Sequence, residues 1–599
     1  MIALVAAVAV VCTLARAFPA RGTDQRLTAG RIVLLMVWDG LRPDAVNQRD
    51  TPNLYALARE GVRFDRHHSV FPTITMVDAA AIATGGTPGA TGILGDWMYF
   101  APILDLAKAR SIPEIGGLIG APIDIENSKT LAALDGPGAL DGHLLGMEGI
   151  ASQVRRAGGY SGIFGKQGPT FLFDGQAASG SAGAQGNYML VADDMAAARP
   201  AAPEPAGKPP LKHGDLGSVG ARDAWFARLV VEQGLPAARA AAASGHPALV
   251  VFWQHNPDLV QHLAGLGTAP AIEALHQDDQ NLARIRGALA ALGIADRTDL
   301  IVVSDHGFAT IRAQISLGDL LVAAGIKQSA DSTDIVIARN GGYDLVYLSR
   351  EQYATEQARR AALVRIVDLA ETKEWSGPIF SQKPAAGAKA AGGEEYTGWI
   401  PGTFSEETIG IHDSPRAPDL VVSFRESPEA TNLGLTGPQN PAFAIGAKAE
   451  QPMQNLSAAL VRPVEGTVYS DTRYEGHLTT GMGMHGAAGA REIHNFCAAA
   501  GPDFRRHFID AAPTGNLDVN ATIRELLRQP GVAGASGRVM REALLKGPRI
   551  GPPPHRFART VSVVLQGMET STTLKFTRFE GEDYLDGSSV TRTARRGTP

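Results

Sequence analysis

The chain has 599 residues, of which 44% are hydrophobic, and its formal net charge at pH 7 is −6. This length allows one large globular core with insertions, or two or three domains. Because no long run of charge of one sign occurs, the sequence indicates neither a nucleic-acid groove nor a polybasic membrane patch, and we expect no stable nucleic-acid binding. The sequence leaves the oligomeric state open.

The N-terminus has the pattern of an export signal. An apolar run of about a dozen residues ends at Ala15-Arg16-Ala17, a small-x-small cleavage pattern. We expect residues 1–17 to be a signal peptide and the protein to be periplasmic or extracellular, with a short signal anchor as the alternative. No later segment is long and apolar enough to predict a membrane span in the mature chain.

The chain alternates between predicted strands and helices. Continuous apolar runs at 31–39, 248–258, 299–307 and 419–424 are typical of strands buried on both faces of a mostly parallel sheet. A helix is predicted after the first run, with Thr51 as its cap, Pro52 in its first turn and Gly61 at its end. A second helix is predicted over 271–293, and the alternation indicates an open α/β fold.

These elements suggest a divided catalytic core. We expect core segments over 30–324 and 481–530, and an inserted lobe or cap over 325–480 that includes the core strand 419–424. Residues 531–599 form a C-terminal extension. Alternating patterns at 559–568 and 572–579 predict a terminal hairpin or small sheet there.

The stretch SVFPTITMVDAAAIATG, residues 69–85, predicts a short helix with hydroxyl groups at its N-terminus. Free N–H groups and the positive end of the helix dipole favour anions at such a position. The alternative is an ordinary threonine cap. Further along, Lys166 in FGKQGPTFLF could approach an anionic substrate, but a surface position is the default expectation.

Metal-capable side chains follow three of the predicted strands. Sites in open α/β sheets form beyond the carboxyl ends of the strands, so these side chains are expected to converge. Each alone could be a turn, cap or packing residue, but the joint pattern favours a metal site. The candidates are Asp39, Asp258, His262, Asp305 and His306, with His485 in the glycine-rich GMGMHGAAG.

The spacing and chemistry of these candidate ligands limit which metal ions the site could bind. One helical turn would place Asp258 and His262 on the same face. Cys12 and Cys497 are the only cysteines of the chain, and Cys12 lies in the predicted signal, so a site built from thiolates is excluded. Carboxylate and imidazole ligands suit zinc, and would tolerate manganese or iron.

Several motifs together resemble one family. VWDGLRPD, TPNLYALAREGVRF, SVFPTITMVDAAAIATG, PDLVQHLAG, VSDHGF and MHGAAG occur in the order found in the alkaline phosphatase superfamily, specifically its type I phosphodiesterase/nucleotide pyrophosphatase branch. The resemblance implies a mostly parallel sheet with helices on both faces. It also implies a metal-dependent hydrolase of phosphodiester or pyrophosphate bonds, with nucleotides or related organic phosphodiesters as substrates.

The resemblance assigns a role to each candidate residue. Thr75 takes the position of the nucleophile that forms a phospho-threonine intermediate, and Thr73 is expected to be a turn hydroxyl. Two zinc ions are implied, one held by Asp39, Thr75, Asp305 and His306, and the other by Asp258, His262 and His485.

One position departs from the family pattern. Asp78 occupies a substrate-binding position where the family usually has Asn. An ionised Asp78 would repel a phosphate, so we expect it to be protonated, turned away or bound to another group.

Other functions remain open from the sequence. A sulfatase is disfavoured because no C/S-x-P-x-R pattern lies near Thr75. A phosphomonoesterase or phosphonate hydrolase on the same core is an alternative, and so is a non-catalytic binding relative.

Overall fold

The structure is a computed structural model that describes residues 30–174, 188–192, 216–382, 394–411, 414–427, 466–471, 478–548, 551 and 553–595. The predicted signal peptide, residues 1–17, lies outside the described residues. Within the described part of the chain, every helix is too short or too polar to cross a membrane.

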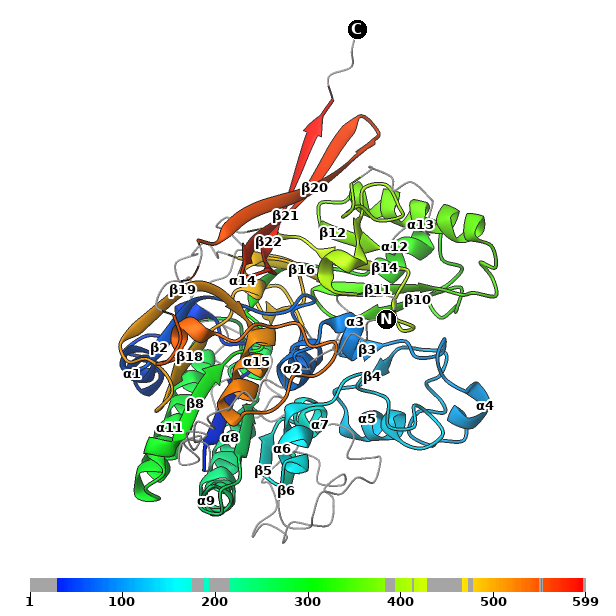
Figure 1. The fold of residues 1–599 in the computed structure, drawn as a ribbon. Coiled ribbons are helices and arrows are strands. Elements are labelled where there is room, and N and C mark those ends of the chain that lie inside the picture. Colours follow the sequence, from blue (N-terminus) through cyan, green and yellow to red (C-terminus); the bar gives the residue numbers. More distant parts are fainter. Residues whose placement is uncertain are drawn as a thin grey trace, which may run out of the picture.

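An eight-stranded sheet forms the centre of the molecule (Figure 1). Its strands are parallel to their neighbours except β18, which runs antiparallel to both β2 and β8. The prediction of a mostly parallel sheet is therefore confirmed. The spatial order is β19 (Phe508–Gly515), β2 (Val62–His68), β18 (Cys497–Ala500), β8 (Thr298–Val303), β1 (Ile32–Trp38), β7 (Ala248–Gln254), β5 (Tyr160–Gly165) and β6 (Tyr188–Ala192).

Helices cover both faces of this sheet, and strand β1 shows why its sequence is apolar throughout. Its alternate residues enter two different hydrophobic clusters, so every residue of the strand is buried. One face packs against α1 (Pro52–Glu60), α8 (Leu216–Leu229), α9 (Leu235–Ala243) and α11 (Ala269–Ala291). The other packs against α2 (Thr75–Thr84), α6 (Ile150–Arg156), α7 (Gln167–Asp174) and α15 (Asn516–Leu527) (Figure 1).

Helix α1 begins and ends where the sequence predicts, but its cap is different. The Thr51 hydroxyl donates to the Asn47 carbonyl and makes no cap hydrogen bond. The Asp279 carboxylate of α11 accepts hydrogen bonds from the backbone N–H groups of Asn53 and Leu54 instead, at 3.0 and 2.8 Å. The first turn of α1 is thus satisfied by a neighbouring helix.

A second lobe is built on a five-stranded sheet. Helices α12 (Leu317–Ala323) and α13 (Glu356–Glu371) pack on it in a separate hydrophobic cluster, so the core of this lobe also uses residues before 325. The order is β10 (Ile335–Arg339), β11 (Tyr343–Leu348), β14 (Leu420–Phe424), β12 (Ser376–Ser381) and β13 (Phe404–Ser405).

The placement of the run 419–424 in the central sheet was wrong. These residues do form a buried strand, β14, but it pairs antiparallel with β11 and β12 of the second lobe. An apolar run shows that both faces of a strand are buried, and it carries no information on which sheet buries them.

Smaller sheets complete the fold. A four-stranded sheet has the order β15 (Glu426–Ser427), β16 (Thr467–Asp471), β9 (Ala309–Ile315) and β17 (Gly483–Met484). The predicted C-terminal β element is confirmed as a three-stranded antiparallel sheet of β20 (His555–Leu565), β21 (Met568–Phe579) and β22 (Glu582–Ala594). The short elements include α3 (Pro88–Thr91), β3 (Trp97–Met98), α4 (Leu106–Ala109), β4 (Ile123–Asp124), α5 (Ser128–Asp135), α10 (Asp258–Ala264) and α14 (Ala490–Ile493).

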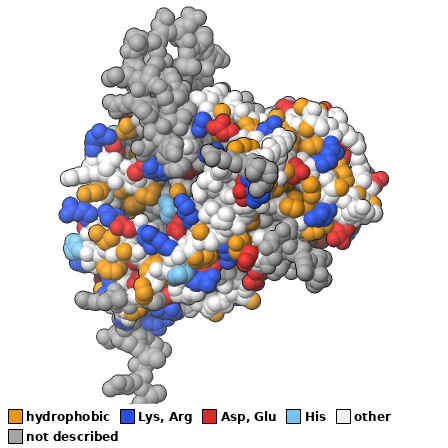
Figure 2. Space-filling view, turned by 90° about the horizontal axis from the view of Figure 1, so that it is seen from above, with side chains coloured by type: hydrophobic (Ala, Val, Ile, Leu, Met, Phe, Trp, Pro, Cys, Tyr) orange, Lys and Arg blue, Asp and Glu red, His pale blue; other side chains and the backbone are white. Residues whose placement is uncertain are grey.

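The surface view agrees with the mixed charge of the sequence. Figure 2 shows acidic and basic side chains interspersed over the face seen from above, with apolar side chains between them. The described charged side chains of this face thus form no broad field of one sign.

Candidate active site

The predicted metal-capable residues meet at one edge of the central sheet. Asp39 follows β1, Asp258 and His262 lie on α10 after β7, and Asp305 and His306 follow β8. These three strands are neighbours and run parallel, so their carboxyl ends lie side by side. Helix α2 begins at Thr75, and His485 directly follows β17.

Three ligand atoms form a compact triangle. His262 Nε2 lies 3.1 Å from His485 Nε2, and Asp258 Oδ1 lies 3.4 and 3.3 Å from these two nitrogens. Metal–nitrogen bonds of about 2.0–2.1 Å place the ligand atoms of a tetrahedral ion roughly 3.3 Å apart. The spacing of the triangle therefore matches one face of a tetrahedral site.

A second group surrounds the Thr75 hydroxyl. His306 Nε2 lies 3.3 Å from Thr75 Oγ1, 3.3 Å from Asp305 Oδ2 and 3.6 Å from Asp39 Oδ1. The rings of His306 and His485 stack with their centroids 3.6 Å apart, so this group adjoins the triangle. Asp258 lies close enough to Asp39 and His306 to be shared by both groups.

The hydrogen bonds of the histidine Nδ1 atoms determine that the Nε2 lone pairs point into the site. The Nδ1 atoms of His262, His306 and His485 lie 2.9–3.0 Å from the backbone carbonyls of Gly483, Gly307 and Thr73. A carbonyl oxygen only accepts, so each Nδ1 carries the hydrogen and each Nε2 presents a lone pair to the site. Metal-binding histidines are commonly held in this way.

The carboxylates are incompletely satisfied by the protein. Asp39 Oδ1, Asp258 Oδ1 and Asp305 Oδ2 are buried and have no hydrogen-bond donor among the residues that the structure describes, although they are the oxygens that face the histidines. Burial raises the pKa of Asp305 well above its usual value, with the Asp39 carboxylate adding to the effect. Burial also lowers the pKa of His306 well below its usual value.

Buried charged groups are stable only when paired. Oxygen atoms without donors beside imidazole lone pairs therefore fit a site for divalent cations. The donor set suits an ion that binds nitrogen and oxygen, such as zinc.

Lys166 is not the surface residue that the sequence suggested. Its side chain is 14% exposed, and its Nζ lies 2.9 Å from Asp39 Oδ2, 2.7 Å from Glu126 Oε1 and 3.5 Å from Thr75 Oγ1. Burial lowers the pKa of Lys166, but the carboxylates of Asp39, Glu126 and Asp258 raise it well above its usual value. A permanent positive charge thus lies beside the Thr75 hydroxyl.

The N-terminus of α2 is not an ordinary threonine cap. Thr75 is the first helical residue and is 2% exposed, and its hydroxyl faces His306. The N–H of Met76 donates to Asp96 Oδ1 at 3.0 Å, a carboxylate that the sequence analysis did not single out. The Thr73 hydroxyl donates to the Ala487 carbonyl, as a structural hydroxyl would.

Asp78 lies on the first turn of α2 and is fully buried. Its Oδ1 accepts hydrogen bonds from the Val70 N–H and from Asn516 Nδ2, both at 2.8 Å. Burial raises the pKa of Asp78 well above its usual value. Burial thus favours the protonated side chain, and the two contacts bind it to other protein groups. A substrate-binding role for Asp78 remains a prediction that these contacts do not favour.

The chain was also compared with known protein families and with curated proteins. A family model described as type I phosphodiesterase/nucleotide pyrophosphatase matches residues 33–109 and 191–432, together just over half of the chain. A search of curated proteins finds no match.

Solved structures with a similar fold include ectonucleotide pyrophosphatase/phosphodiesterase 5 from mouse and human. An inactive variant of the murine protein in complex with AMP is 15% identical in sequence, with a TM-score of 0.52, and the match covers 86% of this chain and 99% of that chain. The human protein is 14% identical in sequence, with a TM-score of 0.52, and the match covers 86% of this chain and 100% of that chain.

Proposed function

Because the chain belongs to the type I phosphodiesterase/nucleotide pyrophosphatase family, we propose that it hydrolyses phosphodiester or pyrophosphate bonds through a phospho-threonine intermediate on Thr75. The observation that carries the proposal is the convergence of buried carboxylate oxygens without donors, and of imidazole lone pairs, on the Thr75 hydroxyl. Nucleotides are the proposed substrates. The AMP bound to the murine protein of similar fold supports that class.

Two zinc ions are the proposed cofactors. Asp39, Thr75, Asp305 and His306 would hold one, and Asp258, His262 and His485 the other. When bound, such ions supply positive charge that favours the ionised form of a threonine hydroxyl and stabilises a developing oxyanion.

The residues of the chain supply position and charge for the reaction. Thr75 Oγ1 attacks phosphorus in line: the bond from Oγ1 to phosphorus forms, the bond from phosphorus to the leaving oxygen breaks, and the hydroxyl proton passes through solvent to the leaving oxygen. Water then cleaves the phospho-threonine and restores the hydroxyl. The first turn of α2 fixes Thr75, whose hydroxyl faces His306.

Lys166 acts as a fixed positive charge in this proposal. Because its pKa is raised, it stays protonated at neutral pH and is unsuited to accept the threonine proton. Its Nζ, 3.5 Å from Thr75 Oγ1, is placed to offset negative charge that develops on that oxygen or on a nearby phosphoryl oxygen.

The test is kcat/KM for a chromogenic phosphodiester and for the matching phosphomonoester on zinc-loaded protein, repeated after chelation and reloading. We expect a strong preference for the diester, and activity that disappears with the metal and returns with it. A monoester preference would reassign the substrate class. Negligible rates on both esters in fully loaded protein would contradict the proposed activity.

A further inference from the structure

A second group of metal-capable side chains lies where the C-terminal sheet meets the core. His68 is the last residue of β2, His494 directly follows α14, and Asp586 lies in β22. One ligand atom from each residue can be chosen so that all three atoms lie within 4.8 Å of one another. None of these residues belongs to the site around Thr75.

The second ring nitrogen of His68 faces a carboxylate. Its Nδ1 lies 2.8 Å from the Thr514 carbonyl oxygen, which only accepts, so Nδ1 carries a hydrogen. Its Nε2 lies 3.2 Å from Asp586 Oδ1. In a neutral imidazole held this way, two acceptors face each other, and a shared cation or an added proton has to lie between them.

His494 completes the group with a second imidazole. Its ring forms a hydrogen bond with the His67 backbone and lies 4.6 Å from the His68 ring, measured between centroids. Both histidines are thus anchored to the backbone through one nitrogen, as metal-binding histidines commonly are.

Asp586 is directed into the group by a β-bulge. Phe576 of β21 pairs with Leu585, and Lys575 pairs with Gly587, so Asp586 is the extra residue in β22. Gly587 has a φ of 135°, and a Cβ there would lie 3.0 Å from the Ala490 backbone nitrogen. Bulges commonly redirect a side chain out of the regular alternation.

The Asp586 carboxylate is already partly satisfied. Its Oδ2 accepts from the Thr577 hydroxyl at 2.7 Å. Arg66 Nη2 lies 3.6 Å from Oδ1, so Arg66 shares that oxygen. At 21% side-chain exposure, Asp586 leaves the group accessible to ions from solvent.

We propose that His68, His494 and Asp586 bind a zinc ion that fastens the C-terminal sheet to the catalytic core. The 3.2 Å between His68 Nε2 and Asp586 Oδ1 is close to the ligand spacing of roughly 3.3 Å around a tetrahedral ion. Imidazole and carboxylate donors without a thiolate suit zinc. The proposal does not depend on the reaction at Thr75.

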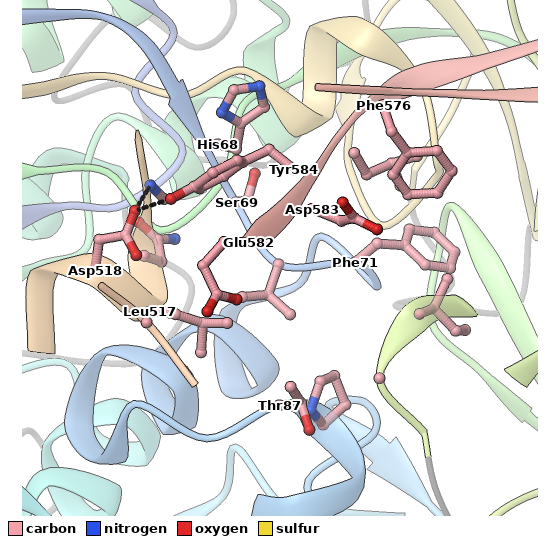
Figure 3. A pocket seen from close by; sticks show the side chains of 18 of the residues that line it. His68, Ser69, Phe71, Thr87, Leu517, Asp518, Phe576, Glu582, Asp583 and Tyr584 are labelled. Carbon is pink, nitrogen blue, oxygen red and sulfur yellow. Dashed lines mark hydrogen bonds between the residues drawn. The ribbon is translucent and has the colours of Figure 1, made fainter. Parts of the chain in front are cut away.

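A cavity beside the group offers room for a water ligand. It has a volume of 140 Å³ and is lined by His68, Tyr584 and Asp518 among others. Figure 3 shows His68 and Tyr584 at one end of this lining and Thr87 at the other. The Tyr584 hydroxyl donates to Asp518 Oδ2 at 2.7 Å, so we assign it no role as a ligand.

The test counts zinc per chain by elemental analysis after exhaustive dialysis. We expect His494→Ala and Asp586→Asn each to hold one zinc ion fewer than the wild type, with kcat/KM on the chromogenic phosphodiester within about twofold. The control is Asp583→Asn in the same strand, whose carboxylate accepts from Arg578 instead of a histidine. Equal zinc content in the wild type and both cluster variants would overturn the proposal.

A measurement on the wild type avoids any folding defect of the variants. Anomalous X-ray scattering at the zinc edge, on crystals grown from zinc-loaded and dialysed protein, should give a peak between His68, His494 and Asp586. Peaks near Thr75 with none at this position would overturn the proposal. Because zinc content and anomalous peaks need no turnover, an inactive enzyme would count against the proposed function alone.

Discussion

His262 Nε2 and His485 Nε2 lie 3.1 Å apart although 223 residues separate them in the chain. Each ring donates its Nδ1 hydrogen to a backbone carbonyl, so two lone pairs point at each other, with Asp258 Oδ1 completing the triangle. Such an arrangement is repulsive without a cation. The arrangement therefore fits a site that could hold a metal ion.

Asp258 is the residue on which both groups of ligands depend, because it lies close to the histidines of each. We expect Asp258→Asn to lose bound zinc and to lower kcat/KM for a phosphodiester by at least about a hundredfold. Zinc analysis and steady-state rates on the same preparation check this. The matched control is Asp296→Asn, an exposed carboxylate. Full zinc content with an unchanged rate would rule out the shared role.

Lys166 places its charge beside the Thr75 hydroxyl, the proposed nucleophile. Lys166→Met should lower kcat by about a hundredfold, because the positive charge next to Thr75 Oγ1 is lost. Lys166→Arg should keep part of the rate, because the guanidinium group retains the positive charge but differs in shape from the ammonium group. Lys108→Met, at an exposed lysine, is the control. If Lys166→Met matched the wild type, the lysine would have only a structural role.

Asp78 should tolerate an amide. Its Oδ1 accepts from Val70 and Asn516, and the amide oxygen in Asp78→Asn can accept both hydrogen bonds. Burial raises the pKa of Asp78, so an uncharged side chain is favoured at this position. We expect kcat/KM to stay within about threefold, whereas Asp78→Ala should cost about 2–4 kcal/mol of stability. Steady-state rates and urea unfolding measure the two effects. A large gain in kcat/KM for Asp78→Asn would instead place this carboxylate at the substrate.

Glu371 should make stability depend on pH. Burial raises the pKa of this carboxyl from 4.5 to about 7, and the nearby Arg592 opposes the shift. The folded state therefore holds the proton more tightly than the unfolded state. The free energy of unfolding should fall as the pH rises from about 4.5 to about 7, by at most roughly 3 kcal/mol.

Glu371→Gln should remove this contribution. We expect urea unfolding at pH 5 and pH 8 to show that the free energy of unfolding falls less with rising pH in the variant than in the wild type. Glu374→Gln, at an exposed carboxylate, should follow the wild type at both pH values. An identical pH dependence for Glu371→Gln and the wild type would contradict the raised pKa.

The sequence predicts much of the site because each part has a local pattern and the topology joins them. Asp39 and Asp305 follow continuous apolar runs, and Asp258 and His262 share one helical turn. Parallel strands of one sheet then bring their carboxyl ends together. Nothing beyond these local patterns and this rule is needed to place the four residues.

The remaining features depend on contacts between distant segments. Lys166 follows β5, the strand next to β7, and its position after YSGIFG is the signal that could have identified it. Its partner Glu126 comes from a different segment, so the local sequence around Lys166 does not predict that the lysine is buried. Two further features depend on contacts that a local sequence pattern does not predict. They are the sheet that strand 419–424 joins and the capping of α1 by Asp279.

Thr75→Ala tests whether Thr75 attacks the substrate, as we propose. The measurement is kcat/KM for a chromogenic phosphodiester, with zinc content determined on the same samples of wild type, Thr75→Ala and the control Thr84→Ala. Thr84 lies at the other end of α2 and donates to the Ala80 carbonyl. We predict that Thr75→Ala abolishes turnover while zinc stays bound, and that Thr84→Ala keeps most of the rate. Unchanged turnover in Thr75→Ala would contradict the mechanism.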